Sequence, residues 1–396
     1  MARHKAEPME AVIKIGGQAR CQEIDLREVP REATEEERAA FFRVVSTTLT
    51  PEQITRIISP EQTYPRQDYV LAVHWHPEQV TMDLVDKRLD ALYPHRQGEL
   101  VIPTQHNVLL RRGDYSGVEV DCYSRGFNRK VQLLMHFKDI DMERAEVLLC
   151  MLKHTFKYRS SQLFEYLNTL VEPAFEDRLQ DAAAQTNTDE DIVGFVRIQA
   201  QKLKDLLLEN EETVSDEAIK NKLVRNFFDT LRERYHDRLI DKAQVFLKAV
   251  KEIVKRHFSL DYFYRASEVI EEARSLGAGI VIPHPEQFWP ILLADYDVDG
   301  IEVWNPQSQQ YTEFLINVVN RRNRMGWHGK RPILIFMGDD CHLSEKLKKP
   351  SEQDPDKARR EVGLQPAWDD YAIRKSLIIN GVNRKKVIEE YRARLA

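Results

Sequence analysis

Two histidines separated by one residue, His74 and His76, follow an apolar run at Tyr69–Val73 that is typical of a buried strand. Side chains at positions i and i+2 of a strand lie on the same face, about 7 Å apart at their Cα atoms. Such a pair can chelate one metal ion from a rigid base, and neutral imidazole suits zinc, iron and manganese. The segment therefore predicts a metal site at the end of this strand.

Further potential ligands follow other short apolar runs. Asp340 and His342 repeat the i, i+2 spacing with a harder oxygen ligand, and the two oxygens of Glu119 could bridge two ions. The complete set contains six histidines, one Glu and one Asp: His74, His76, His106, Glu119, His136, His284, Asp340 and His342. Water bound to such ions loses its proton near neutral pH, and the ions neutralise charge on a phosphoryl group, so the set predicts hydrolytic chemistry.

In sequence order, these motifs resemble those of the PHP (polymerase and histidinol phosphatase) family of metal-dependent phosphoesterases. The matching segments are His74–His76, Thr104–His106, Gly117–Glu119, His136 after an apolar strand, Pro283–Pro285, Gly300–Asn305 and Gly338–His342. The resemblance implies an α/β fold, a distorted (β/α)7 TIM-like barrel of PHP type with its metals at the carboxyl ends of the strands. A long, mainly helical block would interrupt this barrel as an insertion.

The resemblance also implies the roles of individual residues. All eight residues of the set would be metal ligands, and Glu119, Asp340 and His342 would be catalytic. Two positions depart from the family pattern, because Gln105 replaces the usual Asp and Met82 replaces a third His that many members carry after the first pair. The expected cofactors are therefore two divalent ions of Mn, Zn or Fe, with a third ion left open.

The expected substrate is a phosphomonoester, either a small phosphorylated metabolite or a nucleotide, hydrolysed by a metal-bound hydroxide. Phosphate binding needs cations, and Arg111, Arg125 and Arg322 are the arginines favoured for it. A PHP-type nuclease acting on DNA or RNA is an alternative, which the net charge of −6 mildly disfavours. A second alternative is a catalytically weak metal-binding scaffold whose helical insertion binds a partner. The exact substrate and the oligomeric state stay open.

Length and composition indicate a soluble globular protein. The 396 residues are 42% hydrophobic and 31% charged, and the four scattered cysteines show no CxxC spacing, which argues against a disulfide framework and a zinc ribbon. No apolar run reaches the roughly 18 residues that cross a membrane, and no signal-peptide pattern opens the sequence. We therefore expect a cytoplasmic protein with no membrane partner.

Five segments are expected along the chain: an N-terminal accessory segment (1–65), a first barrel part (66–140), a helical insertion (141–265), a second barrel part (266–345) and a C-terminal helical tail (346–396). Sequence patterns also predict individual elements. These are a strand at Ala11–Ile15, helices opened by Thr34 and Thr50, a helix start at Thr188–Asp191, and a last helix from about Asn383 to Leu395. In the insertion, Ser215 is expected to open a helix. Its apolar face would contain Ile219, Leu223, Phe227, Leu231 and Tyr235.

Overall fold

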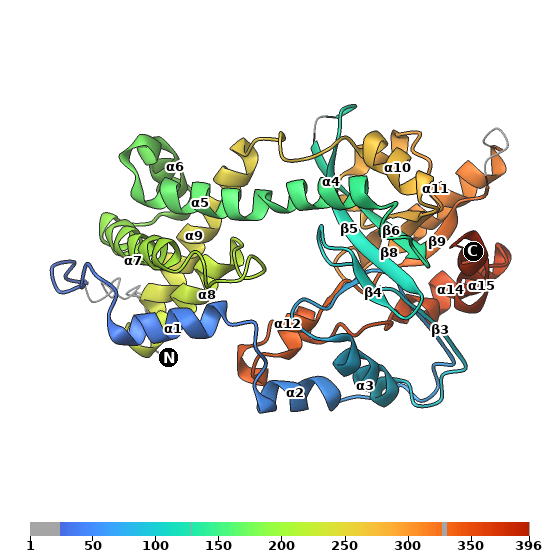
Figure 1. Cartoon of the computed structure of the whole chain (residues 1–396), viewed down its shortest axis with the longest axis horizontal. Helices are drawn as coiled ribbons and strands as arrows, with labels where there is room; N and C mark the ends of the chain where they lie inside the picture. The colour runs from blue at the N-terminus through green and yellow to red at the C-terminus, as the bar shows by residue number, and fades with distance from the viewer. Residues whose placement is uncertain (1–23, 128, 327–330, 396) are drawn as a thin grey trace, which may run out of the picture. The chain divides into compact units, whose positions relative to one another are not determined.

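The structure is a computed structural model that describes residues 24–127, 129–326 and 331–395 (Figure 1). The strand predicted at Ala11–Ile15 lies outside these residues. The described strands are β1 (Tyr69–Ala72), β2 (Trp75–His76), β3 (Gly98–Val101), β4 (Leu110–Arg112), β5 (Tyr115–Ser124), β6 (Arg129–Lys138), β7 (Gly279–Ile282), β8 (Gly300–Trp304), β9 (Leu334–Met337) and β10 (Cys341–His342).

Helices separate most of these strands. The described α-helices are α1 (Glu35–Val45), α2 (Pro51–Ile58), α3 (Met82–Leu92), α4 (Glu146–Phe156), α5 (Tyr158–Val171), α6 (Glu176–Thr186), α7 (Glu190–Glu209), α8 (Lys222–Thr230), α9 (Asp237–His257), α10 (Ala266–Ser275), α11 (Thr312–Arg324), α12 (Leu343–Lys346), α13 (Pro355–Ala358), α14 (Tyr371–Ile379) and α15 (Arg384–Leu395). Short 3-10 helices are η1 (Pro173–Phe175), η2 (Leu231–Glu233), η3 (Pro285–Gln287), η4 (Trp289–Leu293), η5 (Gln309–Tyr311), η6 (Pro350–Glu352) and η7 (Pro366–Trp368).

The described strands form three sheets. Six strands make one mixed sheet in the order β4-β5-β6-β7-β8-β9, while β1 pairs with β3 and β2 pairs with β10. The predicted α/β class is confirmed, but the described strands do not close into one hydrogen-bonded barrel. The six-stranded sheet is also not all parallel, because β5 and β6 pair in an antiparallel hairpin with only four residues between them. A connection this short permits only antiparallel pairing, because a parallel crossover takes about a dozen residues or more.

Apolar helix faces cover the six-stranded sheet. Every residue of β7 is buried, which is typical of a strand packed on both faces. α10 contributes Ala266, Val269, Ile270 and Ala273 to the same core, at the spacing of one helix face. α15 contributes a further set of buried residues, so the predicted C-terminal helix is confirmed and closes this core.

Contacts divide the chain into two compact units. The described part of the first unit comprises residues 24–44, 164–213 and 221–256. Its α-helices are α1 and α5–α9. The second unit comprises residues 45–163, 214–220 and 257–396, and it contains every described strand. The helical character predicted for residues 141–265 is confirmed, whereas the five predicted segment bounds stay a prediction.

Helix caps in the first unit follow the sequence signals closely. Thr34 and Glu37 form the predicted capping box, in which each side chain bonds to the backbone N–H of the other residue. The Asp189 side chain accepts from the Ile192 N–H at 2.9 Å and begins α7. Since these side chains satisfy N–H groups that have no partner inside the helix, they fix where each helix begins.

The prediction that a helix begins at Ser215 is wrong. Residues 215–220 form turns, and α8 begins only at Lys222. The Ser215 hydroxyl accepts from the Glu217 N–H at 3.3 Å, a local bond that competes with helix formation. The predicted apolar stripe is consequently interrupted, because Ile219 precedes the helix and Leu231 belongs to η2.

A buried ion pair lies inside the first unit. The Nζ atom of Lys202 on α7 donates to both carboxylate oxygens of Glu37 on α1, at 2.8 and 2.9 Å. The two residues are only 1% and 4% exposed. Neither charge reaches bulk water, so each depends on the other for compensation.

None of the described helices combines the length and the apolar composition that crossing a membrane requires.

Candidate metal centre

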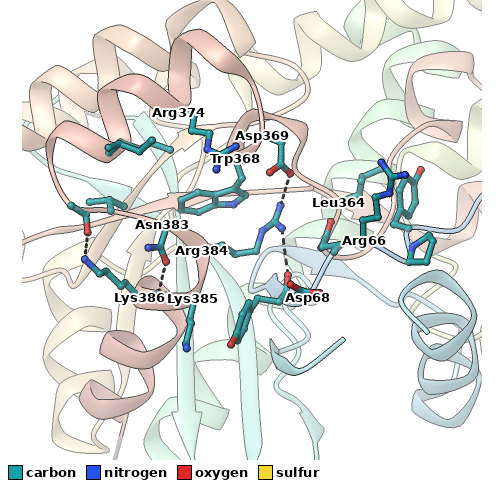
Figure 2. A pocket seen from close by; sticks show the side chains of 18 of the residues that line it. Arg66, Asp68, Leu364, Trp368, Asp369, Arg374, Asn383, Arg384, Lys385 and Lys386 are labelled. Carbon is teal, nitrogen blue, oxygen red and sulfur yellow. Dashed lines mark hydrogen bonds and ion pairs between the residues drawn. The ribbon is translucent and has the colours of Figure 1, made fainter. Parts of the chain in front are cut away.

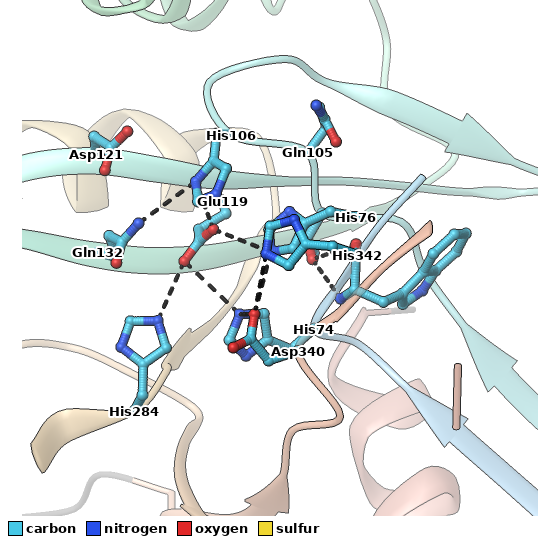
Figure 3. A network of polar contacts seen from close by, with 12 residues as sticks. His74, His76, Gln105, His106, Glu119, Asp121, Gln132, His284, Asp340 and His342 are labelled. Carbon is cyan, nitrogen blue, oxygen red and sulfur yellow. Dashed lines mark hydrogen bonds and ion pairs between the residues drawn. The ribbon is translucent and has the colours of Figure 1, made fainter. Parts of the chain in front are cut away.

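Strand pairing in the second unit brings predicted ligands together from distant parts of the chain (Figure 3). β2 and β10 pair in parallel, and this register places His342 beside His76. A bridge between His106 and Glu119 joins the segment after β3 to β5. The ring of His76 consequently stacks on two others, with its centroid 4.5 Å from that of His106 and 4.2 Å from that of His342.

The structure gathers seven of the eight predicted ligands into three overlapping groups. The groups are His74, Glu119 and His284; His74, His76 and Asp340; and His76, His106 and His342. The potential ligand atoms of each group lie within 4.8 Å of one another. Because His74 and His76 are each shared by two groups, the arrangement favours a centre for more than one ion.

Several buried polar atoms at this centre have no hydrogen bond to any described residue. They are Nε2 of His74 and both ring nitrogens of His76. The buried Glu119 carboxylate faces imidazole nitrogens, with Oε2 2.7 Å from His106 Nδ1 and Oε1 3.5 Å from His284 Nε2. Burying such atoms without partners is costly, and proteins seldom leave several together. Imidazole nitrogens and carboxylate oxygens are ligands for Zn, Mn and Fe, so divalent cations fit the atoms that are present.

Carboxylates and imidazoles set one another's charge at the centre. Burial lowers the pKa of His74, but the Glu302, Asp340 and Glu119 carboxylates together outweigh burial and raise that pKa to about 10. Burial would raise the pKa of Glu119, yet the neighbouring His106 and other rings hold it well below its ordinary value. The pKa of His76 is well below its ordinary value because of burial and the rings around it. Glu119 is therefore ionised and His76 neutral, as metal ligands must be, whereas His74 is protonated in the absence of an ion and would lose that proton on binding one.

Two of the gathered residues have unusual backbone conformations. The φ angles of Asp340 and His284 are +44° and +27°, in a region that residues other than Gly seldom adopt. Such strain costs roughly 1–3 kcal/mol at each residue and persists only where the surroundings enforce it. In this chain it turns two side chains toward the centre, each just after a strand of the six-stranded sheet.

His136 is the one predicted ligand that lies outside the three groups. Its Nδ1 is 2.7 Å from the Tyr391 hydroxyl, and its Nε2 donates to the Val73 carbonyl oxygen at 2.9 Å. Burial lowers its pKa to about 3, so the ring is neutral. Because both ring nitrogens have partners, His136 connects β6 to α15 and to the end of β1.

The three arginines expected to bind phosphate lie in different surroundings. Arg111 is largely exposed, with its Nη2 4.0 Å from Asp139 Oδ1. Arg125 is exposed in the turn after β5, and the half-buried Arg322 donates to the Ala294 carbonyl oxygen at 3.4 Å. These contacts do not connect the arginines with the centre, and their role in phosphate binding stays a prediction.

Residues that the sequence interpretation did not assign hold the ligands in place. Glu302 Oε1 lies 2.8 Å from His74 Nδ1, which directs Nε2 of that ring toward the centre. Gln307 Nε2 and Arg360 Nη1 each donate to Asp340 Oδ2 at 2.8 Å. Glu302 stands in the Gly300–Asn305 motif and was recognisable there, whereas no sequence signal connects Arg360 with Asp340.

Gln105, which departs from the family pattern, contacts the loop beside the centre and is not a member of the three groups. Its Oε1 accepts from the Glu78 N–H at 3.2 Å. The Glu78 carboxylate in turn lies 3.6 Å from Nδ1 of His342. The amide side chain therefore orders a residue that neighbours a ligand, a role that needs an acceptor but no charge.

A Glu302→Gln variant is expected to bind metal about tenfold to 100-fold more weakly than the wild type. The amide can still contact His74 Nδ1, but it cannot supply the negative charge that makes this ring a better donor. The dissociation constant for Mn²⁺ or Zn²⁺, measured by competition with a chelator, checks this prediction. Unchanged affinity would show that Glu302 only packs against His74.

Comparisons with known proteins identify distant structural likenesses only. No family model and no curated protein matches the chain. A candidate metal-dependent phosphoesterase from Bifidobacterium adolescentis is 15% identical, with 81% of this chain and 98% of that chain covered, at a TM-score of 0.39. An amidohydrolase from Chromobacterium violaceum is 14% identical, with 78% and 96% covered, at a TM-score of 0.35. TM-scores this low define neither a fold family nor an activity for this chain.

Proposed function

We propose that the chain is a metal-dependent phosphoesterase whose centre consists of the three ligand groups. The observation that carries this proposal is the convergence on the buried Glu119 carboxylate of ring nitrogens of His74 and His76 that have no hydrogen bond to any described residue. Divalent ions bound there would lower the pKa of water toward neutrality and neutralise charge on a phosphoryl group. The order of the sequence motifs supports the PHP type of phosphoesterase and its barrel.

The centre has one more exposed side. The side chains of His106 and His342 are 32% and 31% exposed, whereas those of His74, His76 and Glu119 are 1% exposed. We assign the entry of the phosphate group to this side, where both rings can meet a substrate.

We propose that His342 acts as a protonated ring that transfers a proton to the leaving oxygen, so the ions would be held by the other six gathered residues. Burial lowers its pKa, but the Asp340 and Glu78 carboxylates outweigh burial and raise that pKa to about 9. Its Nε2 lies 3.4 Å from Asp340 Oδ1. Gln307 and Arg360 bind the other oxygen of Asp340, so this carboxylate has a fixed orientation toward the ring.

We assign a phosphomonoester as the substrate, with a small metabolite or a nucleotide as the group that is released. The net charge of −6 disfavours a long polyanion such as DNA or RNA. Arg360, the guanidinium that reaches Asp340, is buried and already paired with that carboxylate. A single phosphate facing the exposed histidines needs no extended basic surface.

Metal removal and hydrolysis test this function together. The purified chain is expected to contain at least two ions of Mn, Zn or Fe per molecule and to hydrolyse a generic aryl phosphomonoester faster than the matching diester. A chelator should abolish hydrolysis, and adding one of these metals back should restore it. A metal-loaded chain that hydrolyses neither ester would favour the scaffold alternative, and a chain that binds no metal would refute the proposal.

A further inference from the structure

A cavity of about 850 Å³ lies in the second unit, between residues 63–69, α14 and the first turn of α15 (Figure 2). Its volume is in the range of roughly 300–1,000 Å³ that small-molecule sites occupy. Tyr69, the first residue of β1, lines it, whereas His74 follows the other end of this strand. At about 3.3 Å per strand residue, the two residues are on the order of 16 Å apart along the chain. The cavity is therefore separate from the metal centre.

Positive charge dominates the walls of this cavity. Five cationic side chains and two carboxylates line it: Arg66, Arg374, Arg384, Lys385 and Lys386, with Asp68 and Asp369. This excess stands out in a chain whose net charge is −6. Such a concentration of cations in a concave surface attracts anions.

Three of these cations occupy an electrostatically unfavourable place. The first turn of α15 consists of Arg384, Lys385 and Lys386, and this turn contains no acidic residue. The exposed N–H groups at the start of a helix are already positive, so cations there repel them and an anion is stabilised. A local conflict of this kind is typical of a functional site.

The guanidinium of Arg384 is incompletely satisfied. Its side chain is 12% exposed, and its Nη atoms donate to the carbonyl oxygens of Tyr69 and Gln365 at 3.4 Å, beyond the usual N–H···O range. The Asp369 carboxylate is 3.8 Å away, and Nε is buried without a hydrogen bond to any described residue. An anion that approached this guanidinium would supply the acceptors it lacks.

Two further arginines in the cavity are available to a ligand. Arg66 and Arg374 are exposed, and neither forms an ion pair with a carboxylate among the residues described here. Planar guanidinium groups bind phosphate through two parallel N–H···O bonds. Apolar side chains, including Leu364, Ile378 and Val382, complete the wall.

We propose that this cavity binds a phosphate-bearing small molecule, with its phosphate against the guanidinium groups and the start of α15 and its remaining part against the apolar wall. This site is distinct from the metal centre, and the proposal does not depend on hydrolytic activity. The bound molecule is proposed as a ligand of this cavity, in addition to the substrate proposed for the centre.

Binding of inorganic pyrophosphate to the full chain, measured by titration calorimetry, tests the proposal. Excess chelator is present throughout, so that phosphate cannot bind through metal at the other site. The wild type should bind pyrophosphate saturably, and the double variant Arg66→Ala/Arg374→Ala should bind it at least about tenfold more weakly because two phosphate-binding groups are removed. Both arginines are exposed, so the variant should keep the fold.

Arg359→Ala is the matched control, because Arg359 is an exposed arginine outside the cavity. It should change the affinity less than about twofold, since it removes charge without removing a contact. No saturable binding by the wild type would overturn the proposal. The proposal would also be overturned if Arg359→Ala weakened binding as much as the double variant does. It would likewise be overturned if the double variant bound pyrophosphate as tightly as the wild type.

Discussion

A Glu119→Gln variant is expected to lose more than about 100-fold in affinity for Mn²⁺ or Zn²⁺, because loss of a direct ligand should exceed the tenfold to 100-fold effect of an outer partner. Glu119 is fully buried, and its oxygens lie 2.7 Å from His106 Nδ1 and 3.5 Å from Nε2 of both His76 and His284. The amide removes the negative charge and replaces one ligand oxygen by an NH₂ group that cannot coordinate a cation.

Metal stoichiometry after dialysis and chelator competition measure this loss directly. Added Mn²⁺ should raise the melting temperature of the wild type and leave that of the variant unchanged, because only binding to the folded state stabilises it. Glu271→Gln on α10 is the matched control, since Glu271 is exposed. A Glu119→Gln variant with the metal content and affinity of the wild type would exclude this carboxylate as a ligand.

A Lys202→Met variant is expected to be destabilised by about 3–5 kcal/mol, the effect of leaving one member of a buried ion pair unpaired. The Glu37 carboxylate would keep its bond to the Thr34 N–H, but it would lose both bonds from Lys202 in surroundings that exclude water. The free energy of unfolding of the first unit, from urea denaturation followed by circular dichroism, measures the change.

Two further variants separate charge from packing. Lys202→Met/Glu37→Gln should recover most of the loss, because it removes the buried charge as well as its partner. Lys204→Met on the same helix should cost less than about 1 kcal/mol, since Lys204 pairs with the partly exposed Glu172. If Lys202→Met were as stable as Lys204→Met, the buried pair would contribute nothing specific.

Most of the centre could be predicted because its residues follow strands at fixed spacing. The pairs His74–His76 and Asp340–His342 each have the two-residue period of a strand, and the structure pairs β2 with β10 so that both contribute to one place. Spacing cannot reveal what a side chain meets across the fold. His136 was predicted as a ligand because it also follows an apolar run, within β6. Both of its ring nitrogens instead have hydrogen-bond partners, the Tyr391 hydroxyl and the Val73 carbonyl oxygen.

The fold was less predictable where local and long-range signals differ. Capping side chains such as Asp189 act within one turn, so the helix start they predict is confirmed. The closed barrel was expected from motif order, but sheet closure depends on pairings between strands far apart in sequence. The short connection between β5 and β6 fixes one antiparallel pair, but it does not indicate which other strands lie beside that pair.

The predicted ligands of the centre extend from residue 74 to residue 342. Helices α6–α9 of the first unit lie between them in the chain. The complete set of predicted ligands is assembled only when both segments have folded against each other, so full metal affinity is expected only in the folded second unit. Once bound, an ion ties the two segments together as a cross-link would, and it resists their separation. Chelation should therefore make the unfolding of the second unit faster while leaving its refolding rate nearly unchanged.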